Sequence, residues 1–279
     1  MSVVVITGCS SGFGMLSAVE FARRGDQVFA TMRDSAKSGP LKAAAEAAKT
    51  SVEVLELDVN ERESVETAIG EVINRAGRID VLVNNAGIGT HGPVEDFEDD
   101  EVAAIFETNV FGLLRVTRAA VPHMRSQASG TVVNIGSLSG KVTVPFFGIY
   151  GASKHAVEAL SDALYYELHP FGIRVVLIEP GNHATEISNN LRSARRFTEG
   201  SAYLGFKGRF AGAPGKPPSA GQSADPQLVA NVIVDATKAG EPKRRYLVGR
   251  DAELMGGMVK QLSDEDLEKA MRTTLDFWD

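Results

Sequence analysis

Tyr150 and Lys154 are the two residues whose types and spacing most directly suggest chemistry. They stand four positions apart in the run Tyr150-Gly151-Ala152-Ser153-Lys154, so on a helix the phenol and the ammonium would share one face. A free phenol titrates near ~10 and exchanges protons poorly at neutral pH unless a nearby cation favours its phenolate. Lys154 is placed to supply that charge. The spacing alone is more typical of an ordinary exposed helix pair, so its meaning depends on the elements around it.

A glycine-rich turn near the N-terminus predicts a binding site for an anion. The apolar run 2–6 is typical of a short buried strand, and the amphipathic stretch 15–24, which ends at Gly25, predicts a helix. The turn 7–14 between them would leave free N–H groups at the start of that helix, where glycines let a pyrophosphate approach the backbone. A tight strand-to-helix connection without a ligand is the alternative. The residues expected to hold the phosphates are Gly8, Ser10, Ser11, Gly12, Phe13 and Gly14.

Length and composition agree with one cytosolic domain. The chain has 279 residues, of which 43% are hydrophobic, and this is enough to bury a large core. The single cysteine, Cys9, excludes an internal disulfide, and no His, Cys or carboxylate cluster has metal-ligand spacing. We see no signal peptide and no membrane-spanning run, so we expect a cytoplasmic protein. A net charge of −7 argues against nonspecific nucleic-acid binding.

Strand-like and helical patterns alternate along the chain. After the first strand, strands are expected at 27–31, 52–57, 79–83, 131–135, 174–178 and 245–248. Further helices are expected at 40–49, 61–76, 99–126, 150–169 and 226–238. This alternation predicts a single Rossmann-type, doubly wound α/β domain over residues 1–279, with a seven-stranded parallel sheet and helices on both faces. Ligands of such sheets bind beyond the carboxyl ends of the strands.

With these motifs in this order, the chain resembles the classical short-chain dehydrogenase/reductase family over nearly its whole length. The stretch 7–14 matches the family pattern TGxxxGxG, the stretch 84–87 matches NNAG, and Tyr150 and Lys154 match its YxxxK pair. The stretches 9–12 and 30–34 are most similar to the branch that contains 17β-hydroxysteroid and retinol dehydrogenases. The resemblance implies an oxidoreductase that exchanges a hydride with a nicotinamide cofactor.

The resemblance also implies a catalytic tetrad of Asn109, Ser137, Tyr150 and Lys154. Tyr150 would give a proton to a carbonyl oxygen during reduction and take one from an alcohol during oxidation. Lys154 would adjust Tyr150 and bind the nicotinamide ribose, and Ser137 would hold the substrate oxygen. Ser139 is an alternative to Ser137, but its spacing to Tyr150 is two residues shorter than the family pattern. Asn109 would hold a water in a proton relay, although without the resemblance it is only a polar residue inside a helix.

The remaining cofactor contacts follow from the family motifs. Asp58 would meet the adenine amino group, although an Asp at a strand end is equally an ordinary capping or turn residue. The other expected contacts are Val59, Asn85, Ala86, Gly87, Pro180, Gly181 and Thr185. Met32 stands where NAD-selecting relatives carry a carboxylate, and Arg33 can pair with a 2′-phosphate, so we expect NADP(H) to be favoured over NAD(H). Asp34 is the residue that argues against this preference.

Substrate recognition is expected in the Gly-, Ser- and Pro-rich segment 185–225, which would form a lid, and in Phe146 just before Tyr150. Phe146, with its neighbours Pro145 and Phe147, would form an apolar wall for a steroid, a retinoid or a similar bulky molecule, or else belong to the core. His183 could contact nicotinamide or substrate, and His91 could line the same pocket. An anionic substrate is the alternative suggested by Arg192, Arg195, Arg196, Lys207 and Arg209.

The expected function is an NADP(H)-dependent oxidoreductase that interconverts a secondary alcohol and a ketone. A nonenzymatic NADP(H)-binding regulator on the same fold is the alternative, because a fold does not prove a chemistry. The apolar faces expected on helices 99–126 and 150–169 would support a homodimer or homotetramer.

Overall fold

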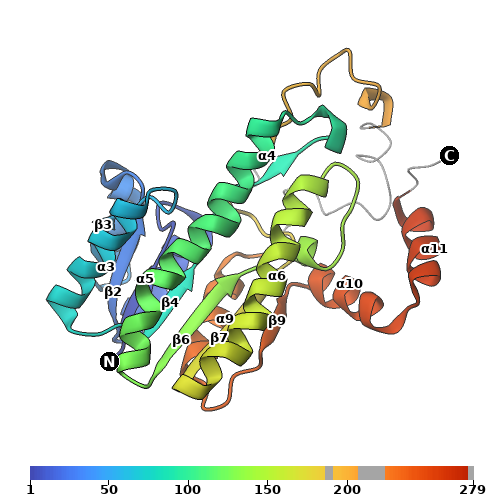
Figure 1. Cartoon of the computed structure of the whole chain (residues 1–279). Helices are drawn as coiled ribbons and strands as arrows, with labels where there is room; N and C mark the ends of the chain where they lie inside the picture. Colours follow the sequence, from blue (N-terminus) through green and yellow to red (C-terminus); the bar gives the residue numbers. More distant parts are fainter. Residues whose placement is uncertain (186–190, 207–223, 276–279) are drawn as a thin grey trace.

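The structure, a computed structural model, describes residues 1–185, 191–206 and 224–275 (Figure 1). Most of the expected lid, including Lys207 and Arg209, lies outside the described residues.

Seven parallel strands form the main sheet (Figure 1). They are β1 (Val3–Ile6), β2 (Gln27–Met32), β3 (Glu53–Glu56), β4 (Val81–Asn84), β6 (Gly130–Ile135), β7 (Ile173–Pro180) and β9 (Arg245–Val248). The strand order is β3-β2-β1-β4-β6-β7-β9, so the winding reverses between β1 and β4. The predicted doubly wound sheet is confirmed, and that reversal is where such folds bind their ligands.

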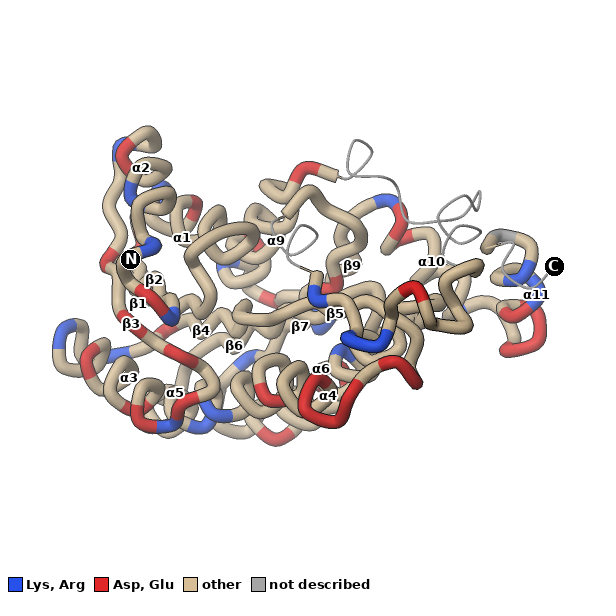
Figure 2. The backbone as a smooth tube through the Cα atoms, turned by 90° about the horizontal axis from the view of Figure 1, so that it is seen from above, with Lys and Arg blue, Asp and Glu red and all other residues tan. Residues whose placement is uncertain are grey.

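Helices cover both faces of the sheet, as Figure 2 shows from above. One face carries α1 (Gly12–Arg23), α2 (Gly39–Ala47) and α9 (Gln227–Lys238), and the other carries α3 (Arg62–Ala76), α5 (Leu113–Ser126) and α6 (Gly148–Leu168). Successive side chains of a strand point to opposite faces. Accordingly, Val4 and Ile6 of β1 pack beneath α1 and α9, whereas Val3 and Val5 pack beneath α3 and α5. Both faces of β1 are therefore buried, which explains its unbroken apolar run.

The single helix expected at 99–126 is interrupted in the structure. It consists of α4 (Asp99–Phe106), a π-helical segment η3 (Glu107–Gly112) and then α5. A capping box between Glu98 and Glu101 begins α4. A Cβ added to Gly112 would lie 2.8 Å from Val59 Cγ2, so this glycine lets the widened turn pack against the loop that follows β3. Hydrophobic periodicity cannot indicate such a turn, because one extra residue per turn leaves the pattern on either side intact.

Several elements were not expected from the sequence. A second, two-stranded parallel sheet pairs β5 (Thr90–His91) with β8 (Arg192–Ser193). Beyond β9 the chain forms α10 (Arg250–Gln261) and α11 (Asp264–Leu275), and α11 projects from the body of the molecule (Figure 1). The short 3-10 helices are η1 (Ser35–Ser38), η2 (Val94–Asp96), η4 (Leu138–Gly140) and η5 (His169–Phe171).

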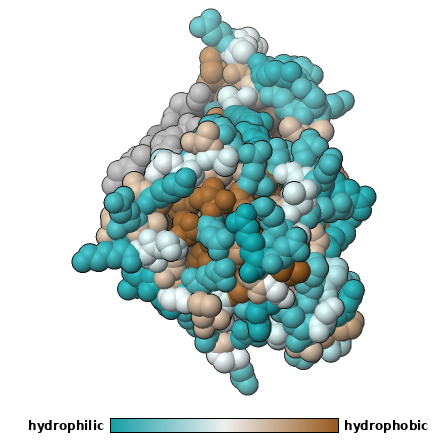
Figure 3. All heavy atoms as spheres, turned by 90° about the vertical axis from the view of Figure 1, so that its left-hand side faces the viewer, coloured by the Kyte–Doolittle hydropathy of each residue, from teal (hydrophilic) through white to brown (hydrophobic). Residues whose placement is uncertain are grey.

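No helix within residues 1–185, 191–206 and 224–275 is both long enough and apolar enough to cross a bilayer. On the face seen in Figure 3, apolar residues gather around a central hollow that hydrophilic residues surround.

Candidate active site

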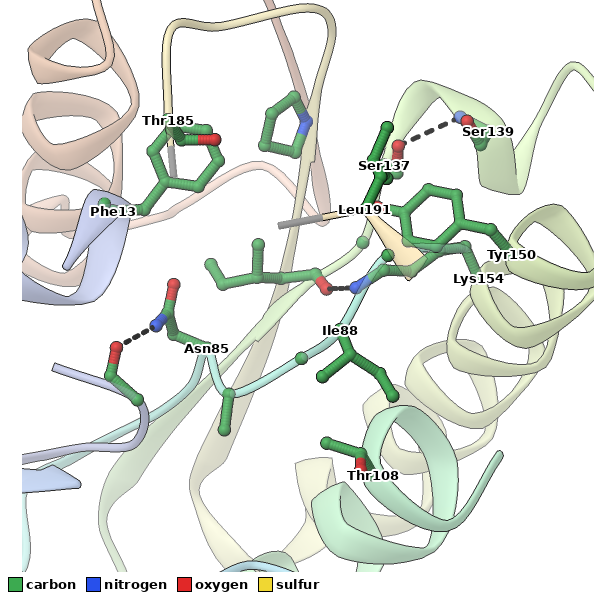
Figure 4. Close-up of a pocket in the computed structure, with 18 of the residues that line it drawn as sticks. Phe13, Asn85, Ile88, Thr108, Ser137, Ser139, Tyr150, Lys154, Thr185 and Leu191 are labelled. Atoms are coloured by element: carbon green, nitrogen blue, oxygen red, sulfur yellow. Dashed lines mark hydrogen bonds between the residues drawn. The ribbon is translucent and has the colours of Figure 1, made fainter. Parts of the chain in front are cut away.

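A cleft of about 970 Å³ opens at the carboxyl ends of the parallel strands. Side chains from both halves of the sheet point into it, with Phe13 and Asn85 on one side and Ser137, Tyr150 and Lys154 on the other (Figure 4). The structure thus brings together nearly all residues that the sequence singled out for cofactor, proton transfer and substrate. Of the residues expected to act in catalysis or cofactor binding, Gly14 and Asn109 do not line the cleft. Of those suggested for substrate in the described part of the chain, Phe146, Pro145, His91, Arg195 and Arg196 do not line it.

The backbone conformation of the glycine turn allows a ligand to approach the main chain closely. Gly8 and Gly12 have φ of +71° and +57°, which side chains rarely permit. A Cβ on Gly14 would lie 2.4 Å from Asn85 Nδ2 and 2.5 Å from the Gly8 carbonyl oxygen, so Gly14 lets α1 pack onto the turn. No side chain caps the N-terminus of α1, and its first turn holds no acidic residue. Its free N–H groups and helix dipole therefore fit a pyrophosphate.

The two amides at the end of β4 have different tasks. Asn85 Nδ2 donates to the carbonyl oxygens of Thr7 and Gly8 at 2.8 and 3.1 Å, which joins β4 to the glycine turn. The Asn84 amide points instead into the buried side of the sheet and donates to Thr117 Oγ1 and Asn134 Oδ1. Asn85 thus bridges the ends of the neighbouring strands β1 and β4.

Asn109 lies in the π-helical segment and is almost fully buried. Its side-chain amide accepts from the Ile88 N–H at 2.9 Å and donates to the Ile88 carbonyl oxygen at 3.0 Å. It also donates to the Ser153 hydroxyl, one position before Lys154. Asn109 therefore joins the loop after β4 to the catalytic helix from behind the cleft, as π-turns at functional sites often do.

Ser137 and Tyr150 meet in the cleft, and their environment sets the proton affinity of the phenol. The Ser137 hydroxyl accepts from the Ser139 N–H at 3.1 Å, so its own proton remains available for the Tyr150 oxygen. Burial raises the pKa of Tyr150, and the hydrogen bond from Ser137 opposes that rise. The expected effect of the Lys154 charge on the pKa of Tyr150 stays a prediction.

Lys154 is buried and held by the backbone of β6. Its ammonium donates to the Ile135 carbonyl oxygen at 2.8 Å and lies 5.8 Å from the centre of the Tyr150 ring. Burial lowers the pKa of Lys154 to about 8, although the nearby Glu158 carboxylate raises it in part. The amine is therefore poised to titrate close to neutral pH.

The residues expected to decide between NAD(H) and NADP(H) lie at the far end of the cleft, after β2. Met32 and Arg33 line the cleft, and the Arg33 side chain is exposed. The competing Asp34 carboxylate is turned to η1, where it accepts from the Ala36 N–H at 3.0 Å and faces Lys37 at 3.9 Å. Asp34 does not line the cleft.

The loop after β3 lies at the same end. Asp58 and Val59 line the cleft, but Asp58 Oδ1 already accepts from the Asn60 N–H at 3.0 Å. Asp58 therefore stabilises a turn in addition to facing the cleft. A role as a turn residue was the alternative to an adenine contact.

The loop after β7 is braced by a residue that sequence reasoning missed. Asp251, in the first turn of α10, accepts from the Asn182 N–H at 2.7 Å. A Cβ on Gly181 would lie 2.1 Å from Asp251 Oδ1, so the carboxylate fills the space that this glycine leaves. Pro180, Gly181 and Thr185 line the cleft, as expected for this loop. Nothing local in the sequence distinguishes Asp251 from an ordinary acidic residue at a helix N-terminus.

His183 lines the cleft and is 2% exposed. Its Nδ1 lies 3.1 Å from the Gly181 carbonyl oxygen and must carry the proton to make that hydrogen bond. Nε2 is then a buried acceptor, and no described residue forms a hydrogen bond with it. The Phe13 ring packs edge-on against the imidazole, with centroids 5.6 Å apart.

The substrate end of the cleft is mainly apolar, but Phe146 is not part of it. Phe146 is buried in a cluster with Phe97, Ala194 and Phe197, so its assignment as a substrate residue is wrong, and its alternative interpretation as core is correct. Phe147 lines the cleft in its place. The other apolar side chains around this end, which the sequence did not single out, are Ile88, Leu138, Val142, Val144, Leu191 and Met255.

The described residues around β8 lie at this end of the cleft. Leu191 and Arg192 line the cleft, whereas the Arg195 guanidinium pairs with Asp100 and Glu101 at the start of α4. Arg195 therefore anchors the segment to α4 and is not available for an anionic substrate. His91 stacks among aromatic rings, 5.5 Å from that of Phe197, and does not line the cleft. Among the described residues, no group of three or more His, Cys, Asp or Glu side chains could hold a metal ion.

Comparison with known proteins agrees with this geometry. The family model described as short chain dehydrogenase matches residues 2–196. The chain is 39% identical to human 17-beta-hydroxysteroid dehydrogenase type 1, covering 88% of this chain and 76% of that protein. It is 37% identical to the uncharacterized oxidoreductase YusZ of Bacillus subtilis, covering 90% of each, and 41% identical to bovine retinol dehydrogenase 8, covering 67% and 61%. The chain therefore belongs to the short-chain dehydrogenase/reductase family and is an oxidoreductase of that family.

Solved structures show the same fold. A short-chain dehydrogenase from Streptomyces avermitilis superposes with a TM-score of 0.80 at 33% identity, covering 98% of both chains. A metagenomic short-chain oxidoreductase in complex with NADP has a TM-score of 0.69 at 27% identity, covering 88% of this chain and 96% of that one. One from Burkholderia phymatum in complex with NAD has a TM-score of 0.79 at 26% identity, covering 96% and 95%. Both dinucleotides thus occur among proteins of this fold.

Proposed function

We propose that this protein is an NADP(H)-dependent oxidoreductase that interconverts a secondary alcohol and a ketone on a bulky hydrophobic molecule. The observation that carries the proposal is the meeting of Ser137, Tyr150 and Lys154 in a cleft that runs from an uncapped helix N-terminus to an apolar end. The glycine turn lines the cleft at the start of α1, where the free N–H groups of the helix fit the pyrophosphate of a dinucleotide.

The side chains divide the work of ketone reduction. The nicotinamide supplies the hydride when bound. Ser137 holds the substrate oxygen, and Tyr150, which its raised pKa keeps protonated at neutral pH, gives that oxygen its proton. Tyr150 is the third residue of α6, so the helix dipole stabilises the phenolate that remains. Lys154 adds positive charge behind it, and in alcohol oxidation the same groups act in reverse.

The preference for NADP(H) is supported by the end of β2. The Arg33 side chain lines the cleft, whereas the Asp34 carboxylate is occupied by η1. No carboxylate of residues 32–34 is therefore placed to bind a ribose 2′-hydroxyl and repel a 2′-phosphate. We expect NADPH to bind at least about tenfold more tightly than NADH, a difference of about 1.4 kcal/mol.

A bulky hydrophobic substrate is supported by the apolar side chains around Tyr150, including Val144, Phe147 and Leu191. The relatives named as a 17-beta-hydroxysteroid dehydrogenase and a retinol dehydrogenase act on molecules of that kind, as their names state.

The test follows NADPH absorbance while steroid, retinoid, quinone and aliphatic ketones are offered. Tyr150→Phe is expected to lower turnover by about 10²-fold or more, because it removes the proton donor, while NADPH affinity stays nearly unchanged. Retained activity in this variant would contradict the role of Tyr150. Tight NADPH binding without turnover of any ketone would favour the nonenzymatic regulator instead.

The cofactor preference is tested separately by calorimetric titration with NADPH and NADH. Arg33→Ala should weaken NADPH binding and leave NADH binding unchanged, since only NADPH carries the 2′-phosphate. Equal dissociation constants for the two cofactors in the wild-type protein would refute the preference.

A further inference from the structure

A cluster of buried charges lies directly behind the turn that carries Ser137. Lys141, the residue after η4, places its ammonium 2.5 Å from Glu158 Oε2 and 3.4 Å from Glu179 Oε1. Arg245 of β9 pairs with the same two carboxylates, at 3.1 Å from Glu179 Oε1. The catalytic roles described above use none of these four residues.

The charged side chains in this cluster are buried or half-buried. The Glu158 and Glu179 side chains are 9% and 1% exposed, and Arg245 is 18% exposed. Burial and the neighbouring Glu158 carboxylate raise the pKa of Glu179 well above its ordinary value. Asp162, one turn beyond Glu158 on α6, also pairs with Arg245 at 2.6 Å. A buried ion cluster of this kind adds little to stability compared with apolar packing, so its presence calls for another explanation.

The cluster joins the three elements that carry the site. Lys141 belongs to the turn of Ser137, and Glu158 stands one helical turn after Lys154 on α6. Glu179 directly precedes Pro180 at the end of β7, where the chain begins to line the cleft. The two Lys141 pairs therefore cross from the Ser137 turn to α6 and to β7, and Arg245 of β9 joins α6 to β7.

Two glycines bring the cluster into contact with the backbone of the Ser137 turn. A Cβ on Gly136 would lie 3.3 Å from Glu158 Oε1. A Cβ on Gly140 would lie 3.0 Å from Glu158 Cγ and 3.1 Å from the Lys154 carbonyl oxygen. The turn thus rests on α6 and on the Glu158 side chain, and a shift of the carboxylate would be transmitted to Ser137.

We propose that Lys141, Glu158, Glu179 and Arg245 form a positioning network that holds the Ser137 hydroxyl against Tyr150 and acts on catalytic turnover rather than on cofactor binding. The proposal rests on the proposed function for its kinetic consequence. Misplacement of a catalytic group by about 1 Å can cost about 10² in rate, so a small movement of the turn would be measurable.

The test compares Lys141→Met, which keeps the apolar stem and removes the charge, with Lys141→Arg, which keeps the charge. Lys141→Met is expected to lower kcat by about tenfold or more, with KM and the NADPH dissociation constant within about threefold of wild type. Lys141→Arg should restore most of kcat. Unchanged kcat in folded Lys141→Met would overturn the proposal.

Arg24→Met is the matched control. Arg24 is 25% exposed, against 26% for Lys141, and it joins α1 to α9 through Glu20 and Asp235 away from the Ser137 turn. Arg24→Met should lower stability about as much as Lys141→Met and leave kcat unchanged. If both variants lowered kcat in proportion to their loss of stability, the network would be only structural.

A measurement that needs no substrate tests the positioning network independently of the proposed function. The ionisation of Tyr150 is measured by ultraviolet titration of each protein against the same protein carrying Tyr150→Phe. In Lys141→Met the pKa of Tyr150 should rise, because the hydrogen bond from Ser137 that lowers it is weakened. An unchanged Tyr150 titration would overturn the network, whereas failure of every ketone to turn over would count only against the proposed function.

Discussion

The Lys154 ammonium is a charged group buried inside the site. It is 6% exposed, and burial lowers its pKa to about 8 because the charged form loses its hydration. One hydrogen bond to the Ile135 carbonyl oxygen and the charge of Glu158 recover only part of that loss. A buried charge of this kind contributes to the chemistry of the site and lowers the stability of the fold.

The pH dependence of stability should reveal this cost. The folded pKa of Lys154 lies below its unfolded value, so the unfolded chain binds more protons between pH of about 8 and 10.5. Across that window the wild-type protein should gain up to about 3 kcal/mol relative to Lys154→Met. Denaturant unfolding of both proteins at pH 7.5 and 10 measures the difference. A difference that does not change with pH would mean that the amine is not desolvated as described.

His183 offers a second test at the scale of one residue. Its buried Nε2 has no hydrogen-bond partner within residues 1–185, 191–206 and 224–275, and an unsatisfied buried acceptor costs about 1–3 kcal/mol. Replacement by Leu should therefore raise the stability of the cofactor-free protein. If a bound cofactor donates to Nε2, the same variant should bind NADPH more weakly, as calorimetric titration would show. Unchanged NADPH affinity would leave His183 a packing residue, and the prediction that it contacts nicotinamide would fail.

At the scale of elements, the junction of β1, α1 and β4 decides whether the dinucleotide site exists. Gly14 lies within α1, where alanine is normally preferred, yet an added methyl group would overlap Asn85 and the Gly8 carbonyl at 2.4 and 2.5 Å. We expect Gly14→Ala to destabilise the protein by about 1–3 kcal/mol and to weaken NADPH binding, because the turn must move away from α1.

Gly70→Ala in α3 is the control for that prediction. A Cβ at Gly70 would meet no atom within 4 Å, so this helix should gain about 1 kcal/mol from the better helix former. Thermal unfolding of the two variants should move in opposite directions. A Gly14→Ala protein as stable as the Gly70→Ala protein would show that the close packing of α1 on the turn is not required.

At the scale of the whole molecule, the homodimer or homotetramer stays a prediction. The helices that would form it carry exposed aromatic side chains, with Phe111 47% and Tyr166 65% exposed. Such residues are favoured at protein interfaces. We expect sedimentation analysis to give the mass of two or four chains, and Phe111→Glu to weaken the association. Leu228→Glu is the control, because Leu228 is 50% exposed on α9 at the opposite face of the sheet. A monomeric wild-type protein would refute the prediction.

The strands, the glycine turn and the Tyr150–Lys154 pair could be predicted from the sequence alone, because each depends on residues that are close together in the chain. The strands were predicted to within about two residues, since apolar runs and helical periodicity depend on near neighbours. The glycine turn was readable because only glycine suits the positive φ of Gly8 and Gly12. The spacing of Tyr150 and Lys154 placed both on α6 by helix geometry.

Only the tertiary structure decided the interactions that join distant segments. It buried Phe146 among Phe97 and Phe197, and it brought Asp251 to Gly181. It also placed Ser137 where its hydrogen bond opposes the raised pKa of Tyr150. A pKa depends on burial and on partners far away in the chain, and neither is encoded in spacing. The sequence by itself therefore determined the sheet, its order of motifs and the class of chemistry, whereas packing determined which side chains face the cleft and how tightly each holds its proton.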